Sequence, residues 1–147
     1  NELDVMERFV AEVDIDCLML PQRYTLLDRS AGKRLLPECE SRGIGVILAA
    51  PFDSGILATG ASENATYNYQ PAAPEVMEQV RRIEAICKQY DVPLPAAALQ
   101  FGLRHSAVQS VVAGMRTADE VASNVALMQY TIPVEFWDAL DTLASRD

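Results

Sequence analysis

Apolar and polar positions follow two different periods along the chain. In several stretches the apolar residues recur every three or four positions among charged ones, which is typical of amphipathic helices. The helices predicted in this way cover Glu2–Val13, Ser30–Arg42, Pro74–Tyr90, Thr117–Met128 and Pro133–Leu143. One more helix is expected over Pro93–Leu103, a segment that is rich in alanine and apolar nearly all round.

Three shorter runs are almost continuously apolar and are predicted to be strands: Ile15–Leu20, Gly45–Ala50 and Gln109–Gly114. Such runs are typical of strands buried on both faces. Because they alternate with helices, they indicate a parallel sheet built from βα units. The segment Phe52–Pro74 between them is predicted to be a long polar loop, and loops of that length are usually functional or mobile.

Three parallel strands with helices fit either a small doubly wound sheet or a piece of a (β/α)₈ barrel. The glycine-rich and Walker phosphate motifs of small nucleotide domains are absent, and the polar, glycine-bearing motifs all follow strands, where a barrel has its active face. A whole barrel needs about 250 residues, whereas this chain has 147 and begins with Asn rather than Met. We therefore expect an α/β fold in which residues 1–147 form part of a barrel whose N-terminal half is absent.

Charge and composition narrow the classes of partner. The chain carries 12 Lys and Arg against 21 Asp and Glu, a net charge of −9, which opposes binding to nucleic acid. Half of its residues are apolar, as in a globular protein. No apolar run reaches the roughly 18 residues of a membrane span, so no membrane partner is expected.

The cysteines indicate the redox environment. Cys17, Cys39 and Cys87 are odd in number, far apart and without a CxxC pair. This spacing does not suit a disulfide framework or a zinc site. We predict three buried free thiols and a reducing, cytoplasmic location, with no metal bound.

Four motifs lie after the predicted strands or in the long loop, namely YTLLDR (Tyr24–Arg29), APFDSGIL (Ala50–Leu57), ENATYNY (Glu63–Tyr69) and VVAGMRTADEVASNVALM (Val111–Met128). Together they resemble the C-terminal half of the aldo-keto reductases, which are NAD(P)-dependent (β/α)₈ barrel enzymes. The ENATYNY loop is similar to the branch of D-threo-aldose (L-fucose) 1-dehydrogenases and pyridoxal 4-dehydrogenases. The resemblance runs from Asn1 to about Trp137 and implies that the three strands are the sixth, seventh and eighth of the barrel.

The resemblance assigns the cofactor diphosphate to the loop after the second strand, where the predicted binding residues are Ala50, Phe52, Ser54, Gly55 and Leu57. In the family, backbone amides of this segment hold the phosphates. Ser54 and Gly55 allow close approach to the backbone, and amides bind phosphate without a cation. The alternative is an ordinary turn from strand to helix.

The segment after the third strand is assigned to adenosine by the same resemblance, with Gly114, Met115, Arg116, Thr117, Glu120, Ser123 and Asn124 as predicted contacts. A helix N-terminus suits an anion, and Arg116 adds a fixed positive charge. Thr117 and Glu120 also have the spacing of a capping box. The alternative is a capped surface helix with solvated charges.

Contacts to the nicotinamide are less well matched. The resemblance implies that Asn1 closes a Ser-Asn pair that holds the carboxamide, although Asn1 also suits a helix cap. Many members have Gln where this chain has Pro21, with Gln22 beside it, and many stack a Tyr on the ring where this chain has Ala49.

The family's catalytic Asp, Tyr, Lys and His come from the first four strands, so the resemblance places no catalytic residue in this chain. Lys33 and Lys88 both lie in helical patterns, and His105 precedes the third strand at the opposite rim. Tyr67 and Tyr69 are expected to be either substrate or lid contacts, or plain loop packing.

The resemblance implies an NAD(P)-dependent oxidoreductase that moves hydride between nicotinamide and an aldose or a pyridoxal-like carbonyl or alcohol. The rest of the barrel would be required, and the chain alone is expected to be inactive. NAD is slightly favoured over NADP, because Glu120 would repel a 2′-phosphate. The alternatives are a non-enzymatic protein that binds nucleotide and reports redox state to a partner, and a self-standing small α/β domain.

Overall fold

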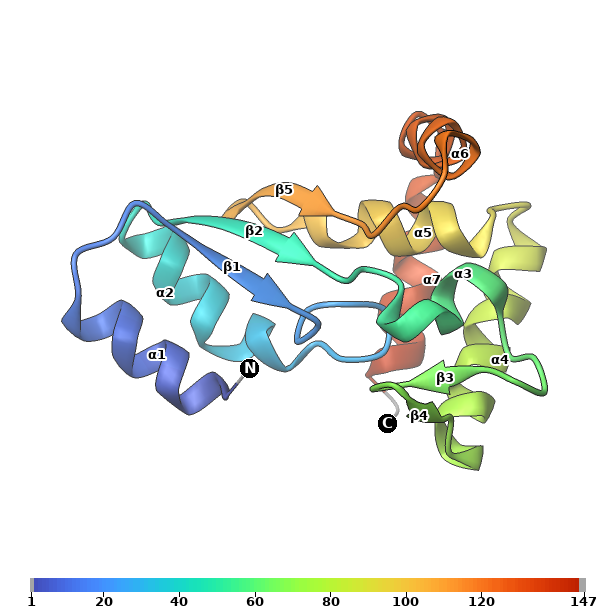
Figure 1. Ribbon diagram of the computed structural model, residues 1–147, viewed down its shortest axis with the longest axis horizontal. Helices are drawn as coiled ribbons and strands as arrows, with labels where there is room; N and C mark the ends of the chain where they lie inside the picture. The colour runs from blue at the N-terminus through green and yellow to red at the C-terminus, as the bar shows by residue number, and fades with distance from the viewer. Residues whose placement is uncertain (1, 146–147) are drawn as a thin grey trace.

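The fold is built on a sheet of three parallel strands, seen in the computed structural model, which describes residues 2–145. The strands are β1 (Cys17–Pro21), β2 (Gly45–Ala49) and β5 (Val108–Val112), in the order β1-β2-β5. Their carboxyl ends all point toward the same end of the molecule (Figure 1). The prediction of an α/β fold with a parallel sheet is therefore confirmed.

The third strand begins one residue earlier and ends two residues earlier than predicted. It begins at Val108 and ends at Val112, and its register against β2 shifts between Val46 and Ile47. The ladder ends where the amide of Ala50 donates to the carbonyl of Val112. Ala113 and Gly114 thus lie beyond the sheet and belong to the rim.

All six predicted helices are present. They are α1 (Leu3–Glu12), α2 (Leu35–Ser41), α4 (Pro74–Gln89), α5 (Leu94–Phe101), α6 (Ala118–Met128) and α7 (Val134–Ala144). Two are shorter than predicted because an adjoining turn is 3₁₀ instead: η1 (Ser30–Lys33) precedes α2 and η3 (Gly102–Arg104) follows α5. Glu2 occupies the N-cap position of α1, and Asn1, which was considered as a cap, lies outside the described residues.

The segment predicted as a long loop has structure of its own. It contains η2 (Asp53–Gly55), the short helix α3 (Ile56–Thr59), and a hairpin formed by β3 (Thr66–Tyr67) and β4 (Gln70–Pro71). Asn68 and Tyr69 make the hairpin turn with φ angles of 50° and 62°. Left-handed residues of this kind allow a tight two-residue connection between antiparallel strands.

Two apolar clusters hold the elements together. In the first, one face of the sheet packs with α1 and α2, through Leu20, Val46, Leu48, Val108, Val10, Leu35, Leu36 and Cys39. The second lies between α3, α4, α5 and α7 and includes Phe101, Phe136, Val80, Ile83 and Leu140. Figure 1 shows α1 and α2 on one side of β1 and β2, with α3, α4 and α7 gathered beyond the carboxyl ends of the strands.

The opposite face of the sheet is open, which corrects the expectation that the strands are buried on both faces. Met19 is 55% exposed and Val112 is 45% exposed. Cys17 shares this face with Met19 because side chains alternate along a strand, and it is exposed, whereas Cys39 and Cys87 are buried as predicted. The strands are apolar on both faces, but the described residues cover only one of these faces.

An ionic cluster ties the last helix to the segment after β1. Asp141 of α7 accepts hydrogen bonds from Arg29 at 2.7 Å and from Arg104 at 2.7 Å and 3.2 Å. These bonds lower the pKa of Asp141, the bond from Arg104 most strongly. Both guanidinium groups also lie over the ring of Phe101, at 4.7 Å and 5.9 Å from its centroid.

Among residues 2–145, no helix combines the length and the apolar character that a membrane crossing requires.

Candidate functional site

A cleft of about 360 Å³ opens between the segment that follows β2 and the segment that follows β5. Several residues predicted to contact the cofactor line it together, although they come from two distant parts of the chain: Phe52, Gly55, Gly114, Arg116, Glu120, Ser123 and Asn124. Four further lining residues were not foreseen, namely Ala58, Thr59, Pro95 and Leu127. Ala58, Thr59 and Pro95 lie outside the four motifs, whereas Leu127 lies within the last one; they line the cleft because α3, α5 and α6 pack around it.

Other predicted cofactor residues lie near the cleft but do not line it. Leu57 is fully buried in the core, and its amide donates to the carbonyl of Phe52. Ala50 and Ser54 belong to the turn itself, and Met115 and Thr117 are exposed at the start of α6. Asn1 lies outside the described residues.

The backbone after β2 makes a tight turn. Asp53, Ser54 and Gly55 have consecutive positive φ angles of 46°, 60° and 101°. Within the turn the amides of Gly55 and Leu57 both donate to the carbonyl of Phe52, and that of Asp53 donates to Ala50. A phosphate that used these amides would have to share them with the loop's own carbonyls, as bifurcated bonds at helix starts do.

Two glycines leave the backbone open on either side of the cleft. A Cβ built on Gly55 or Gly114 would meet no atom within 4 Å, so a ligand has room to approach both peptide units. Gly55 in addition has φ 101°, a conformation that residues with a Cβ rarely adopt. Together with the hydroxyl of Ser123 and the amide of Asn124, these positions offer polar donors to a ligand that carries hydroxyl and phosphate groups.

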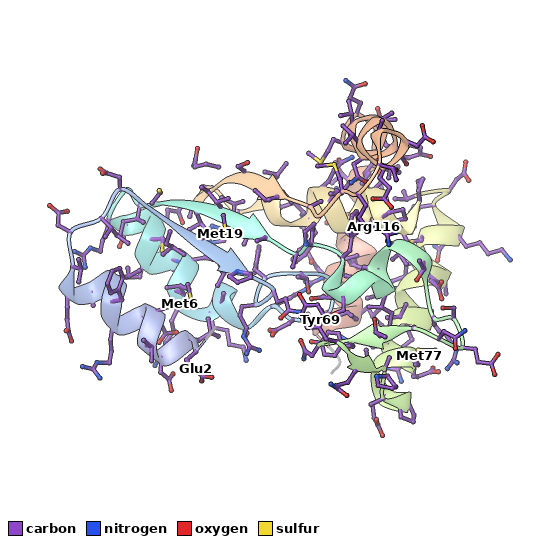
Figure 2. All side chains as sticks on the ribbon, viewed as in Figure 1. Glu2, Met6, Met19, Tyr69, Met77 and Arg116 are labelled. Carbon is purple, nitrogen blue, oxygen red and sulfur yellow. The ribbon has the colours of Figure 1, made fainter. Side chains whose placement is uncertain are left out.

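Ser54 anchors the β3–β4 hairpin. Its carbonyl accepts a hydrogen bond from Thr66 Oγ1 at 3.0 Å, and its Oγ accepts one from the amide of Tyr69 at 3.1 Å. The side chain of Tyr69 is 82% exposed, while Tyr67 is half-buried. Figure 2 shows Tyr69 and Arg116 at the same end of the sheet, beyond the carboxyl ends of the strands.

The start of α6 is capped as predicted, with one difference. The hydroxyl of Thr117 accepts from the amide of Glu120 at 3.1 Å. The carboxylate of Glu120 reaches back one residue further than in a capping box and accepts from the amide of Arg116 at 2.6 Å and from its guanidinium at 2.9 Å. The bond from the amide is the main cause of the lowered pKa of Glu120. The positive charge of Arg116 is therefore already paired.

A buried acid beneath the turn was missed by the sequence analysis. Asp53 is 1% exposed, and its Oδ2 accepts a hydrogen bond from Thr25 Oγ1 at 2.5 Å. Its Oδ1 is buried and has no hydrogen-bond partner in the described part of the chain. Burial raises the pKa of Asp53 to about 6, against the effect of the bond from Thr25, and the charge of Asp28 raises it further.

The remaining candidates for chemistry lie away from the cleft. His105 packs edge-on against the ring of Tyr24, and its Nδ1 accepts from the amide of Ala107 at 3.2 Å, before β5. Lys33 and Lys88 lie on η1 and α4, as their helical patterns predict. Within residues 2–145, no three His, Cys, Asp or Glu side chains are grouped to hold a metal ion.

Comparison with known proteins finds relatives that match nearly the whole of this chain. The chain is 39% identical to a pyridoxal 4-dehydrogenase of Microbacterium luteolum over 95% of its own length and 41% of that protein. It is 38% identical to a D-threo-aldose 1-dehydrogenase of a Pseudomonas species over 93% of its length and 42% of that protein. The holo form of an aldo-keto reductase from Bacillus halodurans superposes with a TM-score of 0.68 at 25% identity and covers 95% of this chain and 46% of that one.

The chain thus spans less than half the length of these relatives, which are oxidoreductases by name. The Bacillus halodurans protein is an aldo-keto reductase, a family of TIM barrels, and the chain matches about half of it. The sequence model of the aldo/keto reductase family matches residues 1–145. The chain belongs to the aldo/keto reductase family.

Proposed function

We propose that this chain is the cofactor-binding side of an NAD(P)-dependent oxidoreductase barrel, in which β1, β2 and β5 are the sixth, seventh and eighth strands. The observation that carries the proposal is the cleft of about 360 Å³, where the turn after β2 and the start of α6 face each other. Ligands of parallel barrels bind at the carboxyl ends of the strands, and this cleft lies at that end.

The residues around the cleft suit the diphosphate and adenosine of a dinucleotide. Gly55 and Gly114 leave peptide groups approachable, and Ser123 and Asn124 offer polar side chains for a nucleoside. The nicotinamide would supply the site that accepts or donates hydride. The chain's own residues would hold the diphosphate and the adenosine. We propose that the proton-transferring groups come from barrel strands that this chain does not contain.

The proposed substrate class is taken from the names of two relatives given above. Their names specify a pyridoxal and a D-threo-aldose dehydrogenase, so we propose an aldose, oxidised at its anomeric carbon, or a pyridoxal-like alcohol or carbonyl. Tyr67 and the exposed Tyr69 are proposed as substrate contacts, because the hairpin that carries them is fastened to the turn at Ser54. A non-enzymatic, redox-reporting role is less favoured, since these relatives are dehydrogenases.

A matched pair of variants on α6 tests the cofactor site. Ser123 and Ala122 are adjacent and both exposed, but only Ser123 lines the cleft. In the protein expressed from its whole coding sequence, Ser123→Trp is expected to weaken NAD binding by about tenfold or more, whereas Ala122→Trp should change it by less than about twofold. Isothermal titration calorimetry measures both without interference from the added indole.

Equal affinity in the Ser123→Trp and Ala122→Trp variants would show that the dinucleotide does not use this cleft.

Steady-state kinetics with an aldose series and with pyridoxal then test the reaction class. Tight cofactor binding without turnover of either substrate class would favour the redox-reporting alternative.

The Arg116–Glu120 pair is expected to set the preference between NAD and NADP. Because the guanidinium is held by Glu120, little positive charge is left for a 2′-phosphate, and the carboxylate repels it. We expect NAD to be used at least as well as NADP. Glu120→Gln should raise the ratio of kcat/KM for NADP to that for NAD by about fivefold.

Arg116→Gln is the matched control for Glu120→Gln and should shift the cofactor ratio in the opposite direction. A wild-type protein that already prefers NADP strongly, or a ratio that Glu120→Gln leaves unchanged, would contradict this assignment. A relative from Escherichia coli, 26% identical over 82% of this chain and 39% of its own length, is named as an NADH-specific methylglyoxal reductase, which accords with the expectation.

A further inference from the structure

Two side chains from different rim segments meet under the turn that follows β2. Thr25 lies in the segment after β1, and Asp53 lies in η2 after β2. Both are buried, at 3% and 1% exposure, and the hydroxyl of Thr25 donates to the carboxylate at 2.5 Å. A bond to a charged acceptor in a buried setting is among the stronger hydrogen bonds in proteins.

Thr25 organises the segment after β1 around this bond. Its Oγ1 also accepts from the amides of Leu27 at 3.2 Å and Asp28 at 3.1 Å, and its own amide donates to the carbonyl of Asp28 at 2.7 Å. The hydroxyl is therefore the centre of a closed turn. That turn continues through Asp28, whose carboxylate accepts from Arg23 at 3.2 Å and from the amide of Ser30 at 2.9 Å.

Asp53 belongs to the turn after β2, as Thr25 belongs to the turn after β1. It begins the run of positive φ angles that continues through Ser54 and Gly55. Such conformations are maintained only where the surroundings hold them. Ser54 next to it carries the hairpin, and Gly55 borders the cleft, so the conformation of this turn affects both.

We propose that Asp53 and Thr25 form a positioning pair for the cofactor. Their hydrogen bond fastens the turn after β2 to the segment after β1, and the charge on Asp53 sets how strongly that turn binds an anionic ligand. Neither side chain lines the cleft, so both act through the backbone of Ser54 and Gly55. The inference rests on the proposed function, since it takes the ligand to be a dinucleotide.

The surroundings of Asp53 make its charge sensitive to pH. Asp28, which is paired with Arg23, faces it from the segment after β1. Tyr67 faces it from β3, where burial first, and then the charges of Asp53 and Asp28, raise the pKa of Tyr67. With its pKa raised to about 6, Asp53 is neutral below that pH and charged above it.

The sign of the stability effect follows from the same pKa. An aspartate in an unfolded chain has a pKa of about 3.9, so the native state holds the proton more tightly. Ionisation of Asp53 therefore works against the fold as pH rises from about 4 to about 6. Above about pH 6 a negative charge also lies beneath the turn proposed to hold the diphosphate, and cofactor affinity should fall.

The first test separates the hydrogen bond from the bulk of the side chain. Thr25→Val keeps the shape but removes the hydroxyl, and Thr25→Ser restores it. In the protein expressed from its whole coding sequence, Thr25→Val is expected to raise the Kd and KM for NAD by about tenfold, with kcat within about twofold, while Thr25→Ser stays near wild type. A loss in kcat alone, or equal losses in both variants, would overturn the positioning role.

The second test changes only the charge. Asp53→Asn keeps an acceptor for Thr25 and cannot ionise. Wild-type affinity for NAD, followed by calorimetry from pH 5 to pH 8, is expected to fall by about threefold to tenfold through pH 6. The profile of Asp53→Asn should be flat.

The outcomes distinguish the inference from the proposed function. A wild-type protein that binds no NAD at any pH refutes the proposed function. A wild type that binds NAD with the same pH profile as Asp53→Asn refutes the role of the charge, even where Thr25→Val fails to fold. Circular dichroism of each variant identifies such a failure.

Discussion

Replacement of Phe101 by alanine is expected to lower the free energy of unfolding by about 3–5 kcal/mol. Phe101 is 1% exposed and is among the largest fully buried side chains of the described residues. Its ring lies 5.0 Å from that of Tyr24, and the guanidinium of Arg29 lies 4.7 Å above it. Alanine would leave a cavity and remove both contacts. Urea unfolding of the protein expressed from its whole coding sequence measures the loss.

Phe101→Leu is the matched control, since it keeps most of the apolar volume while it removes the aromatic face. It should lower the free energy of unfolding by less, about 1–1.5 kcal/mol. A loss below about 1 kcal/mol for Phe101→Ala would mean that the core relaxes into the space. The result bears on the site as well, because Arg29 and Thr25 belong to the same segment after β1.

The order of elements could be predicted because each one carries its own periodic pattern. The helix α6 shows this most clearly: Thr117 caps it through the amide of Glu120, as the spacing of the two residues predicts. The lining of the cleft by Gly114, Ser123 and Asn124 agrees with positions that the family resemblance assigned to adenosine. Whether those residues bind the cofactor stays a prediction.

The burial of strand faces could not be predicted from the apolar runs alone. Leu20 and Met19 are adjacent and both apolar, yet Leu20 is fully buried and Met19 is 55% exposed. Alternation in the strand points them to opposite faces, and within residues 2–145 helices cover only one of these faces. Which face is covered depends on elements distant in sequence.

The hairpin and the buried acid were missed because their sequence signals are short. Asn68 and Tyr69 lack the glycine that usually marks a two-residue turn. The Asp-Ser-Gly stretch at residues 53–55 is equally typical of an exposed turn, and Asp residues are seldom buried. Only the contact with Thr25, a neighbour 28 positions away, shows why Asp53 is inside.

The 147-residue chain, expressed alone, is expected to associate at micromolar concentration and to be inactive. The accessible surface of the structure is 8441 Å², against about 7,400 Å² for a compact protein of 16.1 kDa. In the sheet order β1-β2-β5 both outer strands have an unpaired edge within the described residues, and open edges promote pairing with other chains. Sedimentation velocity and thermal circular dichroism test this expectation.

The double variant Met19→Gln, Val112→Gln identifies the surface responsible for the association. Both side chains lie on the open face of the sheet, exposed by 55% and 45%, so polar replacements should not disturb the buried core beneath. If this face drives association, the double variant should sediment as smaller species than the unmodified chain. The edges of β1 and β5 would be the cause if the double variant associates equally. A soluble monomer of the unmodified chain with one sharp thermal transition would instead show that three strands, covered on one face by α1 and α2, are sufficient for a stable fold.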